Sequence, residues 1–214
     1  MSNMIEITNL CKSFKETKVL NDITIKIKKG NIIGIIGRNG SGKTVLFKCI
    51  CGLVSPTKGT VKINNKILGK DMDIPDNIGA IIETPGFLPN YSGFKNLKFL
   101  AMIKNQINNE HIRDTIKLVG LDPDSKKHVG KYSLGMRQRL GIAQAIMEDP
   151  DVLILDEPMN GLDNEGVKDM RKLFLSLKEQ GKTILLASHN KEDIEVLCDE
   201  VYMMDKGILT QIYN

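Results

Sequence analysis

The segment Gly37-Arg38-Asn39-Gly40-Ser41-Gly42-Lys43-Thr44 matches the pattern G-x-x-x-x-G-K-[ST]. A compact apolar run over 31–36 precedes it and the helix-like run 43–51 follows, so the order is strand, loop, helix. Glycines let the backbone curl until consecutive N–H groups point at phosphate oxygens, while the helix presents its positive end. The segment therefore predicts a nucleoside triphosphate site. Kinases, GTPases and helicases share this loop, so it does not say what hydrolysis drives.

The residue types of this loop indicate individual roles in binding the nucleotide. We expect Lys43 to reach the β and γ phosphates and Thr44 to offer its hydroxyl to Mg²⁺. An accidental glycine-rich turn is the competing interpretation, and the flanking strand and helix argue against it. The residues that we expect to contact the nucleotide here are Gly37, Asn39, Gly40, Ser41, Gly42, Lys43, Thr44 and Val45.

Bulk composition indicates one globular unit of 214 residues. The net charge of +4 comes from 30 basic and 26 acidic residues that are scattered along the chain, which argues against nucleic acid as the principal ligand. No apolar run of about 18 residues and no secretory layout occurs, so we expect a cytosolic chain. The four cysteines include a C-x-C pair, which we interpret as reduced core cysteine rather than a metal site.

The hydrophobic pattern changes twice along the chain. Thr24–Lys28 alternates with period two, as does the run around Val61, which favours half-exposed antiparallel strands. Helical spacing extends from about Pro85 to Met147. Beyond it, strands and helices alternate, which implies a parallel sheet with helices on its faces. We expect these later elements at Val152–Leu155 (strand), Glu165–Glu179 (helix), Thr183–Ala187 (strand), Asp193–Leu197 (helix), Val201–Met204 (apolar run) and near Ile208 (strand).

The fold class that follows is α/β: a P-loop NTPase core with a mostly parallel sheet, an N-terminal antiparallel β subdomain and an inserted α-helical subdomain. Residues 1–84 and 148–214 would form the nucleotide-binding core, and residues 85–147 the helical subdomain. All of it would be a single ATP-binding domain.

Two carboxylates, Asp156 and Glu157, end the buried strand that begins at Val152. The carboxyl edge of an open α/β sheet is where ligands bind. We therefore expect Asp156 to hold Mg²⁺ through water and Glu157 to orient or deprotonate the attacking water. Acidic residues also cap following helices, which is the alternative.

A further motif, Tyr132-Ser133-Leu134-Gly135-Met136, resembles the LSGGQ signature of ABC transporter nucleotide-binding domains, and the similarity covers nearly the whole chain. Its alternative interpretation is a helix start with Ser133 as N-cap, and both can hold, since a helix N-terminus binds anions. The resemblance implies that Ser133 and Gly135 contact the γ-phosphate bound to an opposite subunit. Two chains, identical or paralogous, would then pair head to tail around two ATP molecules.

The same resemblance implies roles for three more residues. Asp163, in Gly161-Leu162-Asp163, stands where the family's D-loop lies across the dimer seam. His189 follows a strand, where the family's switch histidine senses the γ-phosphate; a surface histidine is the alternative. Phe14 matches the aromatic residue that stacks on adenine, with a core aromatic as the competing interpretation.

The sequence departs from the family pattern at three places. Glu83 replaces a glutamine that links nucleotide to helical subdomain; it can still meet Mg²⁺ or the attacking water as a catalytic or metal-binding residue, but it adds negative charge. Val45 replaces a hydroxyl that touches the α-phosphate, which should weaken affinity without abolishing it. Leu134 and Met136 replace signature residues. Glu83 and the YSLGM signature resemble transporters of bacitracin resistance and lantibiotic self-immunity.

The resemblance implies an ATP-hydrolysing subunit that uses ATP and Mg²⁺ and drives a separate membrane permease. We expect the permease to dock at Pro85–Leu97, where apolar residues mix with glycine and proline. The subunit would lie on the cytoplasmic face of the membrane and power export of a hydrophobic compound or antimicrobial peptide. The alternative is a soluble ABC ATPase acting on ribosomes or DNA; such proteins typically carry two cassettes or coiled-coil insertions, which this sequence lacks. A P-loop kinase would leave the signature unexplained.

Overall fold

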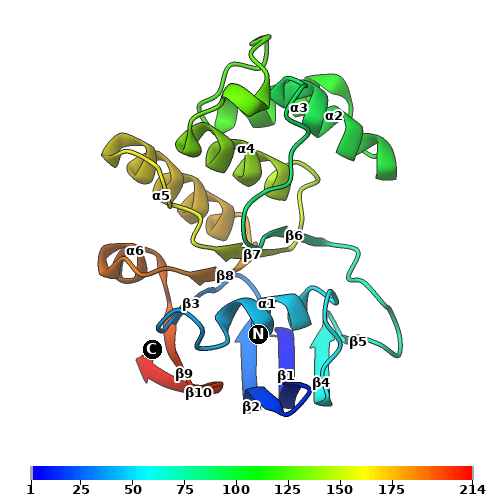
Figure 1. The fold of residues 1–214 in the computed structure, drawn as a ribbon, viewed down its shortest axis with the longest axis vertical. Helices are drawn as coiled ribbons and strands as arrows, with labels where there is room; N and C mark the ends of the chain where they lie inside the picture. Colours follow the sequence, from blue (N-terminus) through cyan, green and yellow to red (C-terminus); the bar gives the residue numbers. More distant parts are fainter. Residues whose placement is uncertain (1, 214) are drawn as a thin grey trace.

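The computed structural model describes residues 2–213, with helices packed around two β-sheets (Figure 1). None of the helices in this described range combines the length and apolar character that a membrane span requires. The helices are α1 (Lys43–Ile50), α2 (Gly93–Lys104), α3 (Asn109–Leu118), α4 (Leu134–Ile146), α5 (Asn164–Glu179) and α6 (Lys191–Leu197), with a 3₁₀ turn at Val129–Lys131.

The smaller sheet is antiparallel and has four strands in the order β2-β1-β4-β5. On β2, Ile23, Ile25 and Ile27 are buried while the residues between them are exposed. This alternation confirms the half-exposed strand that was predicted at Thr24–Lys28. The bounds are β1 (Asn3–Phe14), β2 (Thr17–Lys28), β4 (Lys58–Ile63) and β5 (Lys66–Ile67).

The larger sheet has six strands in the order β10-β9-β3-β8-β7-β6, parallel except for β10, which runs antiparallel to β9. Its central strands are nearly continuous apolar runs because helices or the other sheet cover both faces. The predicted parallel core is therefore confirmed. The bounds are β3 (Ile32–Ile36), β6 (Ile78–Ile81), β7 (Val152–Asp156), β8 (Thr183–Ala187), β9 (Glu200–Asp205) and β10 (Ile208–Tyr213).

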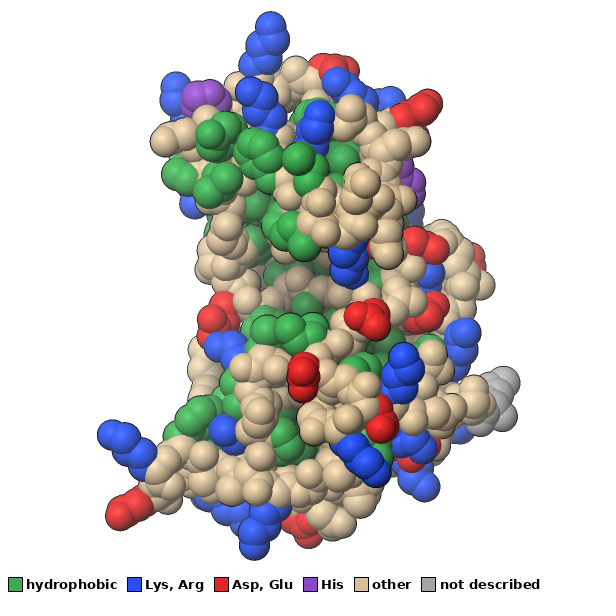
Figure 2. All heavy atoms as spheres, turned by 90° about the vertical axis from the view of Figure 1, so that its right-hand side faces the viewer, with side chains coloured by type: hydrophobic (Ala, Val, Ile, Leu, Met, Phe, Trp, Pro, Cys, Tyr) green, Lys and Arg blue, Asp and Glu red, His purple; other side chains and the backbone are tan. Residues whose placement is uncertain are grey.

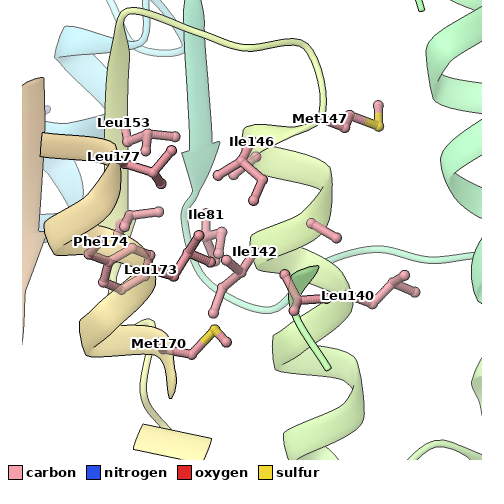
Figure 3. Close-up of a cluster of buried hydrophobic side chains, with 14 of the residues drawn as sticks. Ile81, Leu140, Ile142, Ile146, Met147, Leu153, Met170, Leu173, Phe174 and Leu177 are labelled. Atoms are coloured by element: carbon pink, nitrogen blue, oxygen red, sulfur yellow. The ribbon is translucent and has the colours of Figure 1, made fainter. Parts of the chain in front are cut away.

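The two faces of the larger sheet belong to two different hydrophobic clusters. On one face, α1 and the smaller sheet pack against alternate residues such as Val152 and Ile154. On the other face, α4 and α5 pack against Leu153 and Leu155. Figure 3 shows this second cluster, in which Phe174 of α5 points at the side chains of α4 and the sheet. The molecule is thus layered, with α2 and α3 outermost on the α4 side (Figure 1).

Two features differ from the expectations drawn from the sequence. Strand β6 was not predicted; it approaches α4 so closely that a Cβ at Gly79 would lie 1.8 Å from the Ala145 carbonyl oxygen. Helix does not begin at Pro85 but at Gly93, after an irregular segment. That segment contains prolines, which lack the N–H a helix needs, and Asn96 closes it by accepting from Leu88 N–H at 2.8 Å and donating to Leu88 O at 3.1 Å.

The C-x-C pair lies at the end of α1, where both side chains are buried. Burial raises the pKa of the Cys49 thiol to about 11 and that of the Cys51 thiol to about 12. Both therefore remain protonated at neutral pH and act as small apolar core residues.

A buried ion pair fixes the loop that follows β8. Asp193, only 1% exposed, accepts hydrogen bonds from Arg171 Nε at 2.8 Å and Nη2 at 2.5 Å. Its other oxygen accepts from Ser188 Oγ at 3.1 Å. Arg171 also pairs with the exposed Glu192 at 2.8 Å. Helix α5 is thereby linked to the side chains of Ser188 and Asp193, which precede and follow His189 in the chain.

We predict that Phe174→Ala lowers the free energy of unfolding by about 3–5 kcal/mol, because it leaves a cavity between α5 and the sheet. Urea denaturation followed by circular dichroism measures this loss. Leu118→Ala is the control, since Leu118 is 57% exposed and its truncation should change stability by less than about 0.5 kcal/mol. Equal losses in the two variants would contradict the packing described.

A second prediction concerns the buried pair. Asp193→Asn should lower the unfolding free energy by about 3 kcal/mol, because the Arg171 charge stays buried without its main partner. Glu192→Gln removes the exposed partner of the same arginine and should cost clearly less, because solvent screens an exposed pair. Urea titrations of the two variants at pH 7 compare them directly. A larger loss for Glu192→Gln would reverse this ranking.

Candidate nucleotide-binding site

Parallel pairing brings three chain segments to one edge of the larger sheet. Ile35 of β3 and Asp156 of β7 both lie opposite Ala187 of β8, so the loops that follow these strands emerge side by side. A cleft of about 590 Å³ opens there. Among the residues that line it are Asn39, Gly40, Ser41, Gly42, Lys43, Thr44, Val45, Glu83, Asp156, Glu157 and His189.

The glycine-rich loop adopts a backbone that only glycine accommodates without strain. Gly37 has a φ of 151°, and a Cβ there would lie 2.2 Å from the Met204 carbonyl oxygen. Gly42, with a φ of 115°, is the N-cap residue of α1. Glycine has no side chain that could accept a hydrogen bond from the first N–H groups of the helix. Ser41 Oγ is buried and has no hydrogen-bond partner. An anion at this helix end would satisfy these donors.

Lys43 is buried at the centre of the loop. Its ammonium donates to the carbonyl oxygens of Gly37 at 2.6 Å and Arg38 at 3.2 Å. Neutral carbonyls are weaker partners for an ammonium than phosphate oxygens are. The loop, its lysine and the unpartnered Ser41 hydroxyl thus fit a triphosphate.

Two oxygen ligands suited to Mg²⁺ lie beside this loop. The Thr44 hydroxyl, from the first turn of α1, donates to Asp156 Oδ2 at 2.8 Å. Mg²⁺ takes oxygen ligands and is usually held by one or two protein groups together with substrate phosphates. The hydroxyl and carboxylate therefore fit this ion, and they lie together as the sequence led us to expect.

Glu157 and His189 lie next to each other in the cleft. Glu157 Oε1 is 3.2 Å from His189 Nε2, close enough for an ion pair when the imidazole is protonated, although the geometry is not that of a hydrogen bond. His189 Nε2 also lies 3.0 Å from Asn39 Oδ1, and the backbone N–H of His189 donates to Glu157 Oε2 at 3.4 Å. Burial raises the pKa of the Glu157 carboxyl, and the neighbouring His189 opposes this rise. Such a raised pKa suits a group that takes up a proton.

Glu83 lines the cleft, but its charge has a partner. Its carboxylate lies 2.8 Å from Lys48 Nζ, and its side chain is 64% exposed. The backbone at Glu83 has a φ of 64°, a conformation uncommon for residues other than glycine. Lys48 therefore offsets the negative charge that we expected Glu83 to add near Asp156 and Glu157.

The remaining expected site residues do not line this cleft. Ser133 caps α4 by accepting from Met136 N–H at 3.2 Å, as its alternative interpretation states. Asp163 caps α5 by accepting from Gly166 N–H at 2.9 Å. Gly135 packs beside Gly161. Phe14 is 46% exposed, with Lys12 Nζ 4.7 Å from the centre of its ring. All four thus lie outside this subunit's own cleft.

Several residues of the site were missed from the sequence. Lys48 follows Thr44 by four positions on α1, so helical spacing could have placed it on the same face. The contributions of α4 and of the loop after Glu157 carried no comparable signal, because they depend on how distant elements pack. The additional lining residues are Val19, Thr84, Pro85, Leu134, Arg137, Gln138 and Asn160.

Comparison with known proteins agrees with this geometry. Residues 20–160 match the ABC transporter family model. The chain is 47% identical to the uncharacterised ABC transporter ATP-binding protein YybJ of Bacillus subtilis, covering 96% of this chain and 94% of that protein. It is 41% identical to the bacitracin transport ATP-binding protein BcrA of Enterococcus faecalis (100% and 70% covered). It is 37% identical to the lantibiotic transport ATP-binding protein SrtF of Streptococcus pyogenes (99% and 92% covered).

The fold also matches solved structures. A dimeric post-hydrolysis state of the ATP-binding cassette MJ0796, bound to ADP and Pi, superimposes with a TM-score of 0.87 at 21% identity, covering 99% of this chain and 100% of that one. The expected fold class and family resemblance are therefore confirmed. With its phosphate loop and carboxylates converging on one cleft, the chain belongs to the ABC transporter family, as an ATP-binding subunit with ATPase activity.

Proposed function

We propose that this ATPase powers a separate membrane permease and that two copies, or one copy and a paralogue, clamp two ATP molecules between them. The observation that carries the proposal is the convergence of Lys43, the Thr44–Asp156 pair and the Glu157–His189 pair on one cleft. BcrA and SrtF, two of the relatives, are named as transport ATP-binding proteins.

Each group of the cleft has a separate task in hydrolysis. Lys43 releases the loop carbonyls and binds the β and γ phosphates, while the loop N–H groups and the Ser41 hydroxyl hold the remaining oxygens. Thr44 and Asp156 would hold Mg²⁺, which neutralises charge on the phosphates. Glu157 orients the attacking water and accepts its proton. His189 contacts the γ-phosphate, and Glu83 lies at the cleft edge, within reach of metal or water once it leaves Lys48.

The opposite subunit would complete the site. Ser133 and Gly135 lie at the N-terminus of α4, outside their own cleft, where exposed N–H groups suit an anion carried by another molecule. Asp163 begins α5 at the same surface region, since Gly161 packs against Leu134. Phe14, exposed at the end of β1, is available to stack on adenine. Head-to-tail pairing follows from a site whose parts lie on two surfaces of one chain.

The docking region for the permease would lie on the helical side. We assign residues 85–147 to a helical subdomain and residues 1–84 and 148–214 to the core. Leu88 and Tyr91 of the expected segment are exposed, and the apolar surface continues along α2. Figure 2 shows apolar side chains gathered over this helical part. The exposed large apolar residues of α2 are Phe99, Met102 and Ile103. An exposed apolar surface of this kind favours binding of the cytoplasmic helices of a membrane partner, because binding buries it.

The cargo class would be a hydrophobic compound or antimicrobial peptide moved outward, with the subunit on the cytoplasmic face of the membrane. Support comes from the names of BcrA and SrtF, which specify bacitracin and lantibiotic transport. Action on ribosomes or DNA is not favoured, because the matched relatives are transport proteins and the basic residues form no single stripe in the sequence.

We predict that Glu157→Gln binds ATP and forms the ATP-bound dimer but turns over at least about a hundredfold more slowly, because the amide cannot accept the proton of water. Phosphate release measures turnover, and size-exclusion chromatography with ATP measures dimerisation. Glu179→Gln, an exposed change at the last residue of α5, is the control. Unchanged turnover in Glu157→Gln would remove this carboxylate from the role of base.

A further prediction concerns Glu83→Gln. Loss of the exposed ion pair with Lys48 should reduce stability by less than about 1 kcal/mol, and ATP affinity should stay near normal. Coupling should change: in the reconstituted transporter, the ratio of ATP hydrolysed to substrate moved should differ from the parent. Complete loss of nucleotide binding would contradict a role at the cleft edge.

A further inference from the structure

The backbone of Glu157 is held in an uncommon conformation. Its φ of 51° lies in the left-handed region, which few residues other than glycine adopt. A residue stays in such a conformation only when contacts with the surrounding structure hold its backbone there. The Glu157 N–H donates to Ala187 O at 3.0 Å, and the Glu157 carbonyl accepts from Asn160 N–H at 3.1 Å. These two bonds join backbone groups and do not depend on which side chains are present.

A third bond to the same residue comes from a side chain. Gln138 Nε2 donates to the Glu157 carbonyl oxygen at 3.2 Å. Gln138 is only 8% exposed and lies in α4, one turn after Leu134. A buried amide of this kind has little freedom to swing away. The amide of one helix thus fixes the backbone orientation of a carboxylate-bearing residue on another element.

The N-terminal turn of α4 packs against the segment that follows Glu157. A Cβ at Gly135 would lie 2.8 Å from the Gly161 carbonyl oxygen, and a Cβ at Gly161 would lie 2.5 Å from Leu134 Cγ. Displacement of the helix tip is therefore transmitted to this segment by direct contact. Gln138 extends the same connection to Glu157 itself.

We infer that Gln138 is a positioning residue, which holds Glu157 in place for hydrolysis and links the Ser133-led tip of α4 to the base of the same subunit. The inference rests on the proposed role of Glu157. In the proposed dimer, the N-terminus of α4 contacts the nucleotide of the opposite subunit, while Glu157 acts on the nucleotide bound to its own subunit. Gln138 therefore connects the binding of ATP at the opposite subunit to the position of Glu157 at this subunit's own ATP.

Gln138→Leu tests this, because leucine has similar volume and no donor. Losing one hydrogen bond that orients the base should lower kcat for ATP about three- to tenfold. The KM for ATP and the affinity for a fluorescent ATP analogue should stay within about twofold, since Gln138 does not hold the phosphates. Gln138→Glu keeps the length but offers the carbonyl no donor when ionised, so its kcat should also fall. Gln144→Leu, on the same helix, is the matched control and should keep the parental kcat.

A double variant separates positioning from general weakening. In the Glu157→Gln background, Gln138→Leu should cause no further loss in single-turnover hydrolysis, because there is no base left to position. A further loss there, a rise in KM that accounts for the effect, or an unchanged kcat in Gln138→Leu would each overturn the inference. If Gln138→Leu does not fold, Gln138→Met, unbranched and also without a donor, takes its place.

The turnover of Glu157→Gln separates a failure of the proposed base from a failure of the proposed role of Gln138. Should that variant keep the parental kcat, the assignment of the base fails, and the role of Gln138 fails with it. Should it stall while Gln138→Leu turns over at the parental rate, only the inference about Gln138 fails.

Discussion

The parallel alignment of β3, β8 and β7 is the constraint on which the cleft depends. Parallel strands end at the same edge, so three loops that are far apart in the chain emerge together. The Thr44–Asp156 hydrogen bond, 2.8 Å long, joins the first turn of α1, which follows the loop after β3, to the end of β7. Glu157 and His189, from the third and second loops, make the neighbouring contact. An antiparallel sheet would send these loops to opposite ends.

Charge balance is the second organising feature of this edge. Asp156 and Glu157 bring two carboxylates close together in a partly buried place, and Lys43 and His189 stand opposite them. Glu83 adds a third carboxylate at this edge, but Lys48 pairs with it at the rim. Because this pair is exposed, its free energy is small and it can exchange partners readily. The departure at position 83 is therefore accommodated without a buried unpaired charge.

Connections away from the cleft determine how rigidly its residues are held. The buried Arg171–Asp193 pair ties α5 to the loop that carries His189. The Gln138 amide ties α4 to the backbone of Glu157. Asp163 caps the N-terminus of α5 and Ser133 caps that of α4, and both helix ends belong to the surface that we propose faces a second subunit. The loops that carry Glu157 and His189 are thus each attached to a helix whose N-terminus lies on that surface.

Local patterns were enough to predict the elements whose signal lies in neighbouring residues. The strand Thr183–Ala187 was predicted with its observed bounds, and α1 and α5 were predicted to within one residue at each end. Their apolar periodicity and their glycines act at short range. Strand β6 and the irregular start of the segment at Pro85 were not predicted, since β6 is short and exists through pairing with β7, while the loop is closed by Asn96.

The sequence by itself determined the phosphate loop, the acidic strand end and the family, because each is written in contiguous residues whose chemistry needs that order. Only the tertiary structure decided that Lys48 neutralises Glu83, that Gln138 holds Glu157, and that Ser133 and Gly135 lie outside their own cleft. These facts depend on how helices pack across a sheet, a property of the whole core that no short segment carries.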